Sequence, residues 1–304
     1  MPMHLGKHAK NRGLKRLKYV LLYFVIFLVL AYPFIEPHLI TIHHTAVENT
    51  AIPSGMRPLR IVFVSDIHMQ SWPFFSRAGL NSLVRKINAQ NPDLVLLGGD
   101  YGNSAESTEA FFRALPPIRA NYGVFAVLGE HDRPNPEEGE AEENANQMAL
   151  LRAAMVAKNV TPLVNDVVSV RIGTDTTIQV AGLDDIMTGS PNITELASKC
   201  QNEQYVIFMC HNPEIIPDAQ LALDQKGRRN WFDLGLFGHT HGGQNAIWRD
   251  LFGISPTVPD EYSHGILTEG RATLVISNGI GTSVMPMRLL CPPEIHVITV
   301  TSPK

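Results

Sequence analysis

After residue 58, hydrophobic and polar positions follow two patterns that alternate along the chain. Short apolar runs rich in Val, Ile and Leu are typical of buried strands, and the segments between them have the three- and four-residue spacing of amphipathic helices. The apolar runs predict strands over Leu59–Ser65, Leu94–Leu97, Val124–Leu128, Val167–Arg171, Ile178–Ala181, Tyr205–Met209, Leu234–Phe237, Thr273–Ser277 and Ile295–Val300. The helical spacing predicts helices over Arg77–Ala89, Glu106–Ala114, Glu142–Ala157, Ile193–Lys199 and Pro213–Leu223. Alternation in the first half implies parallel pairing, and the strand-rich second half implies a second sheet.

The pattern before residue 59 is different. Six basic residues and no acidic one precede an apolar run from Tyr19 to Ile35. As a helix this run measures roughly 26 Å, close to the thickness of the hydrocarbon layer of a bilayer. We expect residues 1–18 to be a basic cytoplasmic tail, residues 19–36 a transmembrane signal-anchor, residues 37–58 a linker and residues 59–304 one domain.

A buried core helix and a cleaved signal peptide are the alternatives to a membrane anchor. A core helix would not follow directly on six lysines and arginines. Val29 and Ala31 form a weak cleavage site, but the run is longer than most signal sequences, which favours an uncleaved anchor. In either case the rest of the chain is exported.

Composition limits the class of protein further. Charged residues make up 18% of the chain and the formal net charge is -4, which indicates neither a disordered chain nor a surface for nucleic acid. The three cysteines, Cys200, Cys210 and Cys291, include no C-x-x-C pair. A disulfide framework or a zinc–thiolate site is therefore not expected. About 250 residues follow the apolar segment, enough for one large α/β domain.

Five short segments each end an apolar run and supply carboxylate or imidazole side chains. They are 66–68 (Asp-Ile-His), 98–100 (Gly-Gly-Asp), 129–132 (Gly-Glu-His-Asp), 210–212 (Cys-His-Asn) and 238–244 (Gly-His-Thr-His-Gly-Gly-Gln). Most are weak signals alone, because Asp-x-His or Gly-Asp is also common at the start of a turn. The last segment is more specific. Its two histidines are bracketed by glycines, which allow the backbone to approach a metal or a phosphate closely.

These five segments should form a single site, because loops at the carboxyl ends of strands in α/β sheets converge on one crevice. Four carboxylates, counting Asp132, and five of the chain's 12 histidines would meet there. Oxygen and imidazole ligands without thiolate suit Mn, Fe, Zn or Co better than Ca or a structural Zn. The alternative, a set of coincidentally polar loops, does not explain why all five follow predicted strands.

The order of the segments is similar to that of the calcineurin-like metallophosphoesterases, over roughly residues 59–300. The resemblance implies an α/β fold with two facing mixed β-sheets flanked by helices, a four-layer sandwich, preceded here by one transmembrane helix. It implies a metal-dependent phosphoric ester or anhydride hydrolase. The expected cofactors are two divalent metal ions, with Mn first and Fe, Zn or Co as alternatives.

The resemblance also implies a role for each residue of the site. The ligands of one ion would be Asp66, His68 and His241. The ligands of the other would be Glu130, His211 and His239. Asp100 would bridge both ions, and His131 would contact the phosphate and protonate the leaving oxygen, with Asp132 as its orienting partner. Two ions about 3.5–4 Å apart clamp phosphoryl oxygens and acidify a bridging water, and an imidazole with a pKa of about 6.5 suits the proton transfer.

Glu130 departs from the family pattern, in which this position is Asn. Together with Asp66 and Asp100 it leaves two divalent ions with a net charge of +1, where Asn would leave +2. A less positive site should bind metal more tightly, acidify water less and attract phosphate less. We expect Glu130 to ligate metal while shifting metal preference or slowing turnover.

Three further stretches resemble a narrower group. They are 182–185 (Gly-Leu-Asp-Asp), 278–281 (Asn-Gly-Ile-Gly) and 287–294 (Met-Arg-Leu-Leu-Cys-Pro-Pro-Glu). They are similar to the membrane-tethered bacterial phosphoesterases that include the second-type UDP-2,3-diacylglucosamine pyrophosphatases of lipid A synthesis. The same residues also have structural explanations, with glycines forming turns and Arg288 paired with Glu294. These stretches are therefore weak evidence about the identity of the substrate.

The anchor and the resemblance together predict a single-pass protein of the bacterial inner membrane, with a cytoplasmic N-terminus and an extracytoplasmic catalytic domain. A UDP-lipid made in the cytoplasm would lie on the opposite face of that membrane. The predicted reaction is therefore hydrolysis of a phosphodiester or pyrophosphate bond in a membrane lipid or another envelope substrate. A UDP-2,3-diacylglucosamine substrate would require the reverse topology.

Two alternative functions remain open. A catalytically weak envelope protein would use the same fold to bind a phosphorylated ligand, but such a module does not need a leaving-group acid such as His131. A nucleotide phosphodiesterase is the other alternative. Polynucleotides are disfavoured by the acidic stretch 137–143, and the only exported basic cluster is Lys226, Arg228 and Arg229. We expect no nucleic-acid partner.

Overall fold

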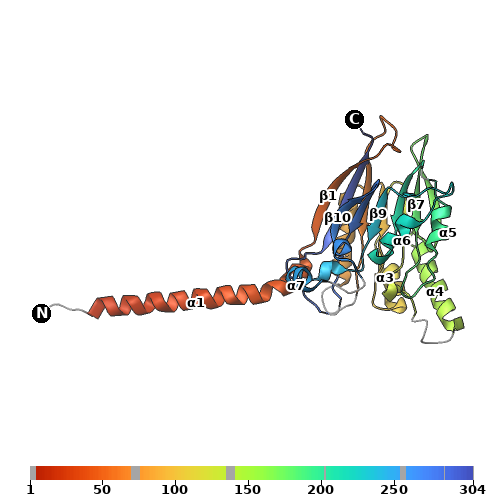
Figure 1. Ribbon diagram of the computed structural model, residues 1–304. Helices are drawn as coiled ribbons and strands as arrows, with labels where there is room; N and C mark the ends of the chain where they lie inside the picture. Colours follow the sequence, from red (N-terminus) through yellow and green to blue (C-terminus); the bar gives the residue numbers. More distant parts are fainter. Residues whose placement is uncertain are drawn as a thin grey trace.

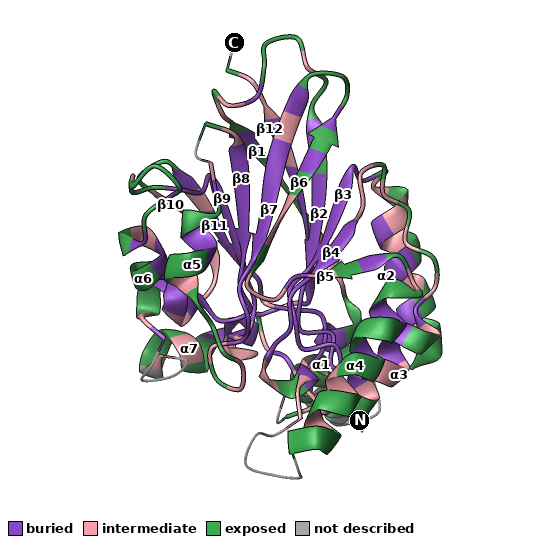
Figure 2. Cartoon of the chain, turned by 90° about the vertical axis from the view of Figure 1, so that its right-hand side faces the viewer, coloured by how far each residue is buried: buried purple, intermediate pink, exposed green. Residues whose placement is uncertain are grey.

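The body of the protein consists of two stacked β-sheets with helices on both outer faces, and a long N-terminal helix extends away from it (Figures 1 and 2). The structure is a computed structural model that describes residues 5–69, 76–134, 141–201, 203–253, 258–283 and 285–303, with side chains from residue 16 onward. The predicted stretch 137–143 lies partly outside the described residues.

The first sheet has six strands in the order β1-β12-β2-β3-β4-β5. Their bounds are β1 Thr41–Glu48, β2 Leu59–Val64, β3 Leu94–Leu97, β4 Val124–Ala126, β5 Val160–Pro162 and β12 Glu294–Thr301. Strands β2 to β5 are parallel, whereas β12 runs antiparallel to β2 and parallel to β1. The β2–β3 and β3–β4 connections contain helices α2 Arg77–Ala89 and α3 Ala105–Ala114, as parallel pairing requires.

The second sheet has the order β10-β11-β9-β8-β7-β6. Its strands are β6 Asp166–Ile172, β7 Thr176–Gly182, β8 Tyr205–Met209, β9 Leu234–Phe237, β10 Gly265–Glu269 and β11 Ala272–Ile276. The four central strands are parallel, and each edge strand is joined to its neighbour by an antiparallel hairpin. Both sheets are therefore mixed, as the sequence predicts.

Three apolar clusters hold the layers together. The middle cluster lies between the sheets and includes Phe63 and Leu96 from one sheet and Ile207 from the other. An outer cluster packs the first sheet against helices α2, α3 and α4 Ala141–Val156. The other outer cluster packs the second sheet against α5 Ile193–Ser198 and α6 Ile216–Leu221. The predicted four-layer sandwich is confirmed (Figure 2).

Short elements lie mainly in the connecting segments. The 3-10 turns are η1 Glu36–His38, η2 Glu130–Asp132, η3 Pro213–Ile215, η4 His241–Gly243 and η5 Asp260–Tyr262. A seven-residue helix, α7 Ala246–Phe252, follows η4 after two residues, and the Asn245 side chain caps it by accepting from the amides of Ile247 and Trp248. Neither η4 nor α7 was predicted from the sequence, because both are too short to show a helical period.

The N-terminal helix, α1, spans Leu5–Ile35, and a candidate membrane span, Arg16–His38, runs from within α1 to the end of η1. Every residue from 16 to 30 is exposed, so this helix is not the core helix that the sequence left as an alternative. The structure differs from the linker predicted over 37–58. Within that segment Thr41–Glu48 forms β1, and it pairs with β12 from Thr41↔Glu294 to Glu48↔Thr301. The sheet thus begins 18 residues earlier than the predicted boundary at Leu59.

Candidate metal centre

Every predicted ligand lies just beyond the carboxyl end of a parallel strand. Asp66 and His68 follow β2, Asp100 follows β3, Glu130 follows β4, and His211 follows β8. His239 and His241 follow β9. These strands are neighbours within their sheets, and the two sheets face each other, so their loops meet at one end of the sandwich. The convergence expected from the sequence is present.

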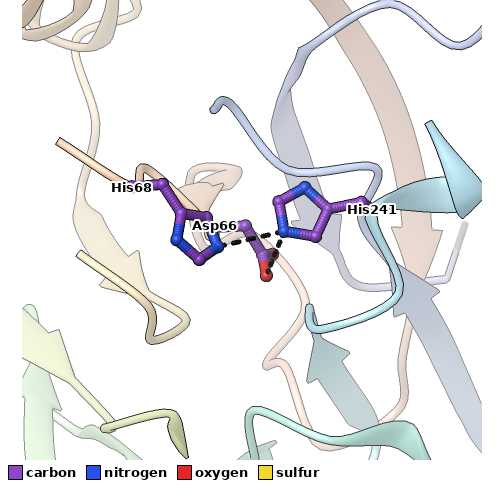
Figure 3. Close-up of side chains that lie close together, drawn as sticks. All are labelled: Asp66, His68 and His241. Carbon is purple, nitrogen blue, oxygen red and sulfur yellow. Dashed lines mark hydrogen bonds and ion pairs between the residues drawn. The ribbon is translucent and has the colours of Figure 1, made fainter. Parts of the chain in front are cut away.

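One group of ligands consists of Asp66, His68 and His241, all buried (Figure 3). The Nε2 atoms of His68 and His241 lie 3.0 Å apart, and Nε2 of His241 lies 3.7 Å from Oδ1 of Asp66. Two ligand atoms that are each about 2.1 Å from the same ion are separated by about 3–3.5 Å. The three side chains therefore have the spacing of a shared cation site.

A second group consists of Glu130, His211 and His239. Glu130 reaches both histidines, with Oε2 3.2 Å from Nε2 of His211 and Oε1 2.8 Å from Nδ1 of His239. Glutamate at position 130 thus lies among the ligand atoms, where the family pattern has asparagine. His239 also has Oε1 of Glu214 3.7 Å from its Nε2. Glu214 was not identified from the sequence, because it lies inside the helical turns that begin at Pro213.

Asp100 lies between the two groups. Its Oδ2 atom is 3.5 Å from Nε2 of His68 in the first group and 3.3 Å from Nε2 of His211 in the second. Its other oxygen accepts a hydrogen bond of 3.1 Å from the backbone amide of His131. One carboxylate in contact with a histidine of each group has the position of a bridging ligand.

The backbone at the site is strained. Asp66, His68, Asp100, His239 and His241 all have positive φ, between 45° and 67°, in the left-handed region that residues with a Cβ rarely adopt. Each such residue costs about 1–3 kcal/mol, and such residues cluster at functional sites. Five of the seven predicted ligands share this conformation. The strain lowers the stability of the folded state, and the conformation points these side chains into the site.

Two glycines allow the loops to pack directly on the ligands. A Cβ on Gly129 would lie 2.3 Å from Oδ1 of Asp100, and a Cβ on Gly238 would lie 2.4 Å from Oδ2 of Asp66. Both distances are far below van der Waals contact. No larger residue fits at either position without moving a ligand, which explains glycine in the segments Gly129-Glu130 and Gly238-His239.

Several buried ligand atoms make no well-aligned hydrogen bond, although Glu130 lies within ion-pair distance of both histidines. Within the described residues these atoms are Oδ2 of Asp66, Oε2 of Glu130, Nε2 of His211 and Nδ1 of His239. Buried polar atoms without aligned hydrogen bonds are costly, and a cation among them would offset that cost. The donor set of carboxylates and imidazoles fits divalent transition metals. The residues present therefore fit a dimetal centre.

The charges of the site are interdependent. Burial raises the pKa of Asp66 and lowers that of His241, which keeps His241 in the neutral form that ligates metal. Burial also opposes ionisation of Asp100 and Glu130, but the neighbouring His211 lowers the pKa of both carboxyls below their ordinary values. The same two carboxylates raise the pKa of His211 against the effect of burial. In the absence of metal, a proton shared with His211 offsets part of the negative charge.

Partners behind the ligands select the imidazole nitrogen that faces the centre. Nδ1 of His68 lies 2.8 Å from Oδ1 of Asn103, and Nδ1 of His211 lies 2.7 Å from the carbonyl of Gly98. In each case Nδ1–H donates and the lone pair of Nε2 is left for metal. Asn103 was not identified from the sequence; its position three residues after Asp100 is the only sequence signal for this role.

The contacts of Asp132 differ from those expected of a residue that orients His131. It is fully buried, and its oxygens accept from the amides of Asp100, Tyr101 and Gly129 and from the hydroxyl of Thr108, at 2.7–2.9 Å. The pKa of Asp132 is raised to about 7, mainly because the carboxyl is buried and secondly because the carboxylate of Asp100 is nearby. These contacts tie together the two loops that carry Asp100 and Glu130. Asp132 thus holds the ligand loops rather than the imidazole of His131.

His131 lies at the exposed mouth of the centre. Its ring centroid is 5.4 Å from that of His68, in an edge-on arrangement. His131 and Glu130 also line a cleft of about 710 Å³ beside the metal ligands. Arg133, on the wall of the same cleft, is held by Asp184 at 2.5 Å. A substrate entering this cleft would reach the ligands past His131.

Arg288 does not form the ion pair with Glu294 that the sequence suggested. It is fully buried and donates to the carbonyls of Gly281, Asn278 and Cys291, at 2.6–3.1 Å. Its Nη2 also lies 3.5 Å from Nδ1 of His241. Glu294 contacts His296 at 2.9 Å and His43 at 3.2 Å instead. Arg288 therefore braces the loop that supports a metal ligand.

Comparison with known proteins is consistent with this geometry. The model of the calcineurin-like phosphoesterase family matches residues 59–243, which contain all seven proposed ligands. A protein named "Uncharacterized metallophosphoesterase YkuE", from Bacillus subtilis, is 28% identical over 88% of the chain and 88% of its own length. "Phosphodiesterase YaeI" from Escherichia coli is 28% identical over 79% of the chain and 82% of its own length. A "Transmembrane protein with metallophosphoesterase domain" from Bos taurus is 30% identical over 78% of the chain and 52% of its own length.

Proposed function

The chain belongs to the calcineurin-like phosphoesterase family, and on that premise we propose that it is a membrane-anchored dimetal enzyme that hydrolyses a phosphodiester or pyrophosphate bond in a membrane lipid or another envelope substrate. The family supports a metal-dependent phosphoester hydrolase in general. The proposal adds the metal, the anchor and the kind of substrate. Mn²⁺ is the proposed metal, with Fe, Zn or Co as alternatives, because the donor set has oxygen and imidazole but no thiolate.

The roles proposed for the side chains follow from their positions. The first ion would be held by Asp66, His68 and His241, and the second by Glu130, His211 and His239, with Asp100 shared. Bound there, two divalent cations would neutralise phosphoryl oxygens and supply a nucleophilic hydroxide near neutral pH. His131, at the mouth of the cleft, is placed to donate a proton to the leaving oxygen. Asn103 and the carbonyl of Gly98 keep two of the ligand imidazoles in the required tautomer.

One observation carries the membrane part of the proposal: the end of α1 is joined to the loop beside the metal centre. Glu36, just beyond α1, is buried and accepts from the amides of Leu290 and Cys291 at 2.8 and 2.5 Å. The thiol of Cys291 in turn donates to the carbonyl of His241 at 3.3 Å. If α1 spans a bilayer with its basic end in the cytoplasm, the centre is held close to the outer surface of the inner membrane.

The test uses the purified full chain with Mn²⁺ in detergent. UDP-diacylglucosamine is offered and UMP release is followed, with a generic aryl phosphodiester as a control for competence and Asp100→Asn as the blank. We expect hydrolysis of the aryl diester that Asp100→Asn abolishes. Envelope lipids with phosphodiester or pyrophosphate bonds are then compared at equal concentration.

The outcomes separate the alternatives. UMP release that is lost in Asp100→Asn would identify a UDP-lipid pyrophosphatase, whose cytoplasmic substrate conflicts with the proposed topology. Hydrolysis of the aryl diester without UMP release would support an envelope substrate on the outer face. If neither compound is hydrolysed by metal-loaded protein, a module that binds a phosphorylated ligand is favoured over an enzyme.

A further inference from the structure

We propose that α7 and the segment 285–290 form a surface that rests on the bilayer entered by α1, so that the domain is held against the lipid and not only tethered to it. We call this surface the docking face and define it by five exposed apolar residues, Ile247, Trp248, Leu251, Met285 and Leu290. The proposal rests on the membrane anchoring proposed above for α1. It goes beyond anchoring, because a tether alone would leave the domain free to tumble.

The five apolar side chains of the docking face are each about half exposed or more. Leu251 is 69% exposed, Trp248 63%, Leu290 60%, Met285 50% and Ile247 49%. On α7, at about 100° per residue, the three apolar side chains fall within a single arc of about 100°, outside which Arg249 and Asp250 lie. Scattered exposed apolar residues are normal on a soluble surface, but a contiguous group marks an interaction site.

A mostly apolar groove runs through the same surface. It has a volume of about 430 Å³, and Trp248, Met285, Met287 and Leu289 are among its lining residues. Methionine and leucine provide flexible apolar walls, and tryptophan is the residue best suited to the boundary between lipid and water. A surface of this composition fits the headgroup and upper acyl region of a bilayer.

The connection to α1 identifies the bilayer as the occupant. The amide of Arg288 donates to the carbonyl of Pro33 near the end of α1, at 2.9 Å, and the amide of Leu290 donates to Glu36. The carbonyl of Leu289 accepts from the amide of Ala246, the first residue of α7. The docking face is thus fixed by backbone hydrogen bonds to the last turn of the membrane helix. Figure 1 shows α7 at the point where α1 meets the domain.

Docking would also orient the metal centre. η4 contains His241 and is followed after two residues by α7, and Nη1 of Arg249 donates to the carbonyl of Gly242 at 3.2 Å. A domain that rests on α7 therefore presents the His241 loop at a fixed height above the lipid.

The test reads lipid contact at single positions of the full chain in nanodiscs. The three native cysteines are buried, so an environment-sensitive fluorophore can be attached at Leu251→Cys without labelling them. Leu150→Cys, 53% exposed on α4 at the far side of the domain, is the matched control. Leu28→Cys in α1 reports insertion of the anchor. Nitroxide-labelled lipids, with the quencher about 5–10 Å below the headgroups, quench only labels in contact with the bilayer.

We expect quenching at positions 251 and 28 and none at position 150. Quenching at 28 with none at 251 would overturn the docking face while leaving the anchor intact. No quenching at 28 would overturn the anchor and the docking face together. A label at 251 that is shielded equally in detergent, in proportion to protein concentration, would show that a second copy of the chain covers the surface, and this result would also overturn the proposal.

Discussion

The Nε2 atoms of His68 and His241 face each other 3.0 Å apart, within a site where both side chains are buried. Nδ1 of His68 is occupied by Asn103, and Nδ1 of His241 lies beside the guanidinium of Arg288. The His68 tautomer that donates from Nδ1 carries a lone pair on Nε2, whereas the guanidinium of Arg288 can only donate, which favours the His241 tautomer with its proton on Nε2. Without metal, Nε2–H of His241 can therefore donate to Nε2 of His68. A cation held by both rings would need the lone pairs of both Nε2 atoms, so metal binding in the first group would replace this hydrogen bond.

Removal of metal should destabilise the protein. We expect a chelator to lower the midpoint of thermal unfolding and Mn²⁺ to restore it, because an ion bound only by the folded state at about 100 times its Kd contributes about 2.7 kcal/mol. His241→Ala should reduce the bound metal from two ions to about one per chain, measured by elemental analysis. His44→Ala, at an exposed position of β1, is the control. Retention of two ions by His241→Ala would contradict the assignment of the first group.

Glu130→Asn should weaken metal binding and alter turnover. The substitution removes one negative charge from a carboxylate that contacts both His211 and His239. We expect a higher Kd for the second ion and, once the site is saturated, a faster reaction, because a more positive centre acidifies water and attracts phosphate more strongly. Calorimetric metal titration and kcat at saturating Mn²⁺ measure the two effects. Glu48→Gln, at an exposed position of β1, controls for charge alone; unchanged affinity and rate in Glu130→Asn would refute this account.

His131→Ala should lower kcat without changing metal content. General acid catalysis contributes about 10²–10⁴-fold, and its loss matters most when the leaving alkoxide is basic. We therefore expect a large decrease for alkyl phosphodiesters and a much smaller one for nitrophenyl esters, whose leaving group needs no proton. A comparison of both substrates under metal saturation gives the ratio. Equal losses on both would indicate that His131 binds phosphate and does not protonate the leaving group.

The central strands and the ligand set were predictable from sequence, because both have strong local signals. Buried parallel strands are uninterrupted apolar runs, and the ligands follow them directly in the chain. β1 was missed because its residues, Thr41–Glu48, include two histidines and a glutamate and show no strong apolar alternation. Its pairing depends on β12, about 250 residues later in the chain. Contacts at such separation leave no local pattern.

The supporting residues of the site were less predictable than its ligands. The role of Asp132 depends on the positions of four donors from three segments, and the role of Arg288 depends on carbonyls that only the folded loop presents. Sequence reasoning assigned both residues a nearby charged partner, Asp132 to His131 and Arg288 to Glu294. The structure gives both of them mainly backbone partners instead, with the Thr108 hydroxyl as a side-chain donor to Asp132. Hydrogen bonds to backbone do not depend on the identity of the partner residue, so the sequence carries no record of them.

A final prediction concerns stability in acid and depends on Asp93, far from the metal ligands in the turn before β3. Asp93 is 1% exposed and accepts from the guanidinium of Arg57 at 2.6 and 3.0 Å, from the amide of Arg60 at 2.9 Å and from Asn121 at 2.8 Å. Burial alone would raise the pKa of this carboxyl, but the hydrogen bonds from Arg57 and Arg60 lower it below the ordinary value of 3.8.

A pKa that is lower in the folded state means that the unfolded chain binds the proton more readily. The stabilisation by Asp93 is therefore complete at neutral pH, begins to decline near pH 4 and is lost as the pH falls through the lower folded value. We expect Asp93→Asn to cost about 1–3 kcal/mol at pH 7, mainly through the buried amide contacts, since the exposed Arg57 adds little. Its free energy of unfolding should then depend less on pH below 4 than that of the wild type.

Asp175→Asn, in the exposed β6–β7 turn, is the control, and denaturant unfolding from pH 3 to 7 is the measurement. Parallel pH curves for wild type and Asp93→Asn would show that Asp93 is not the group that links acid to unfolding.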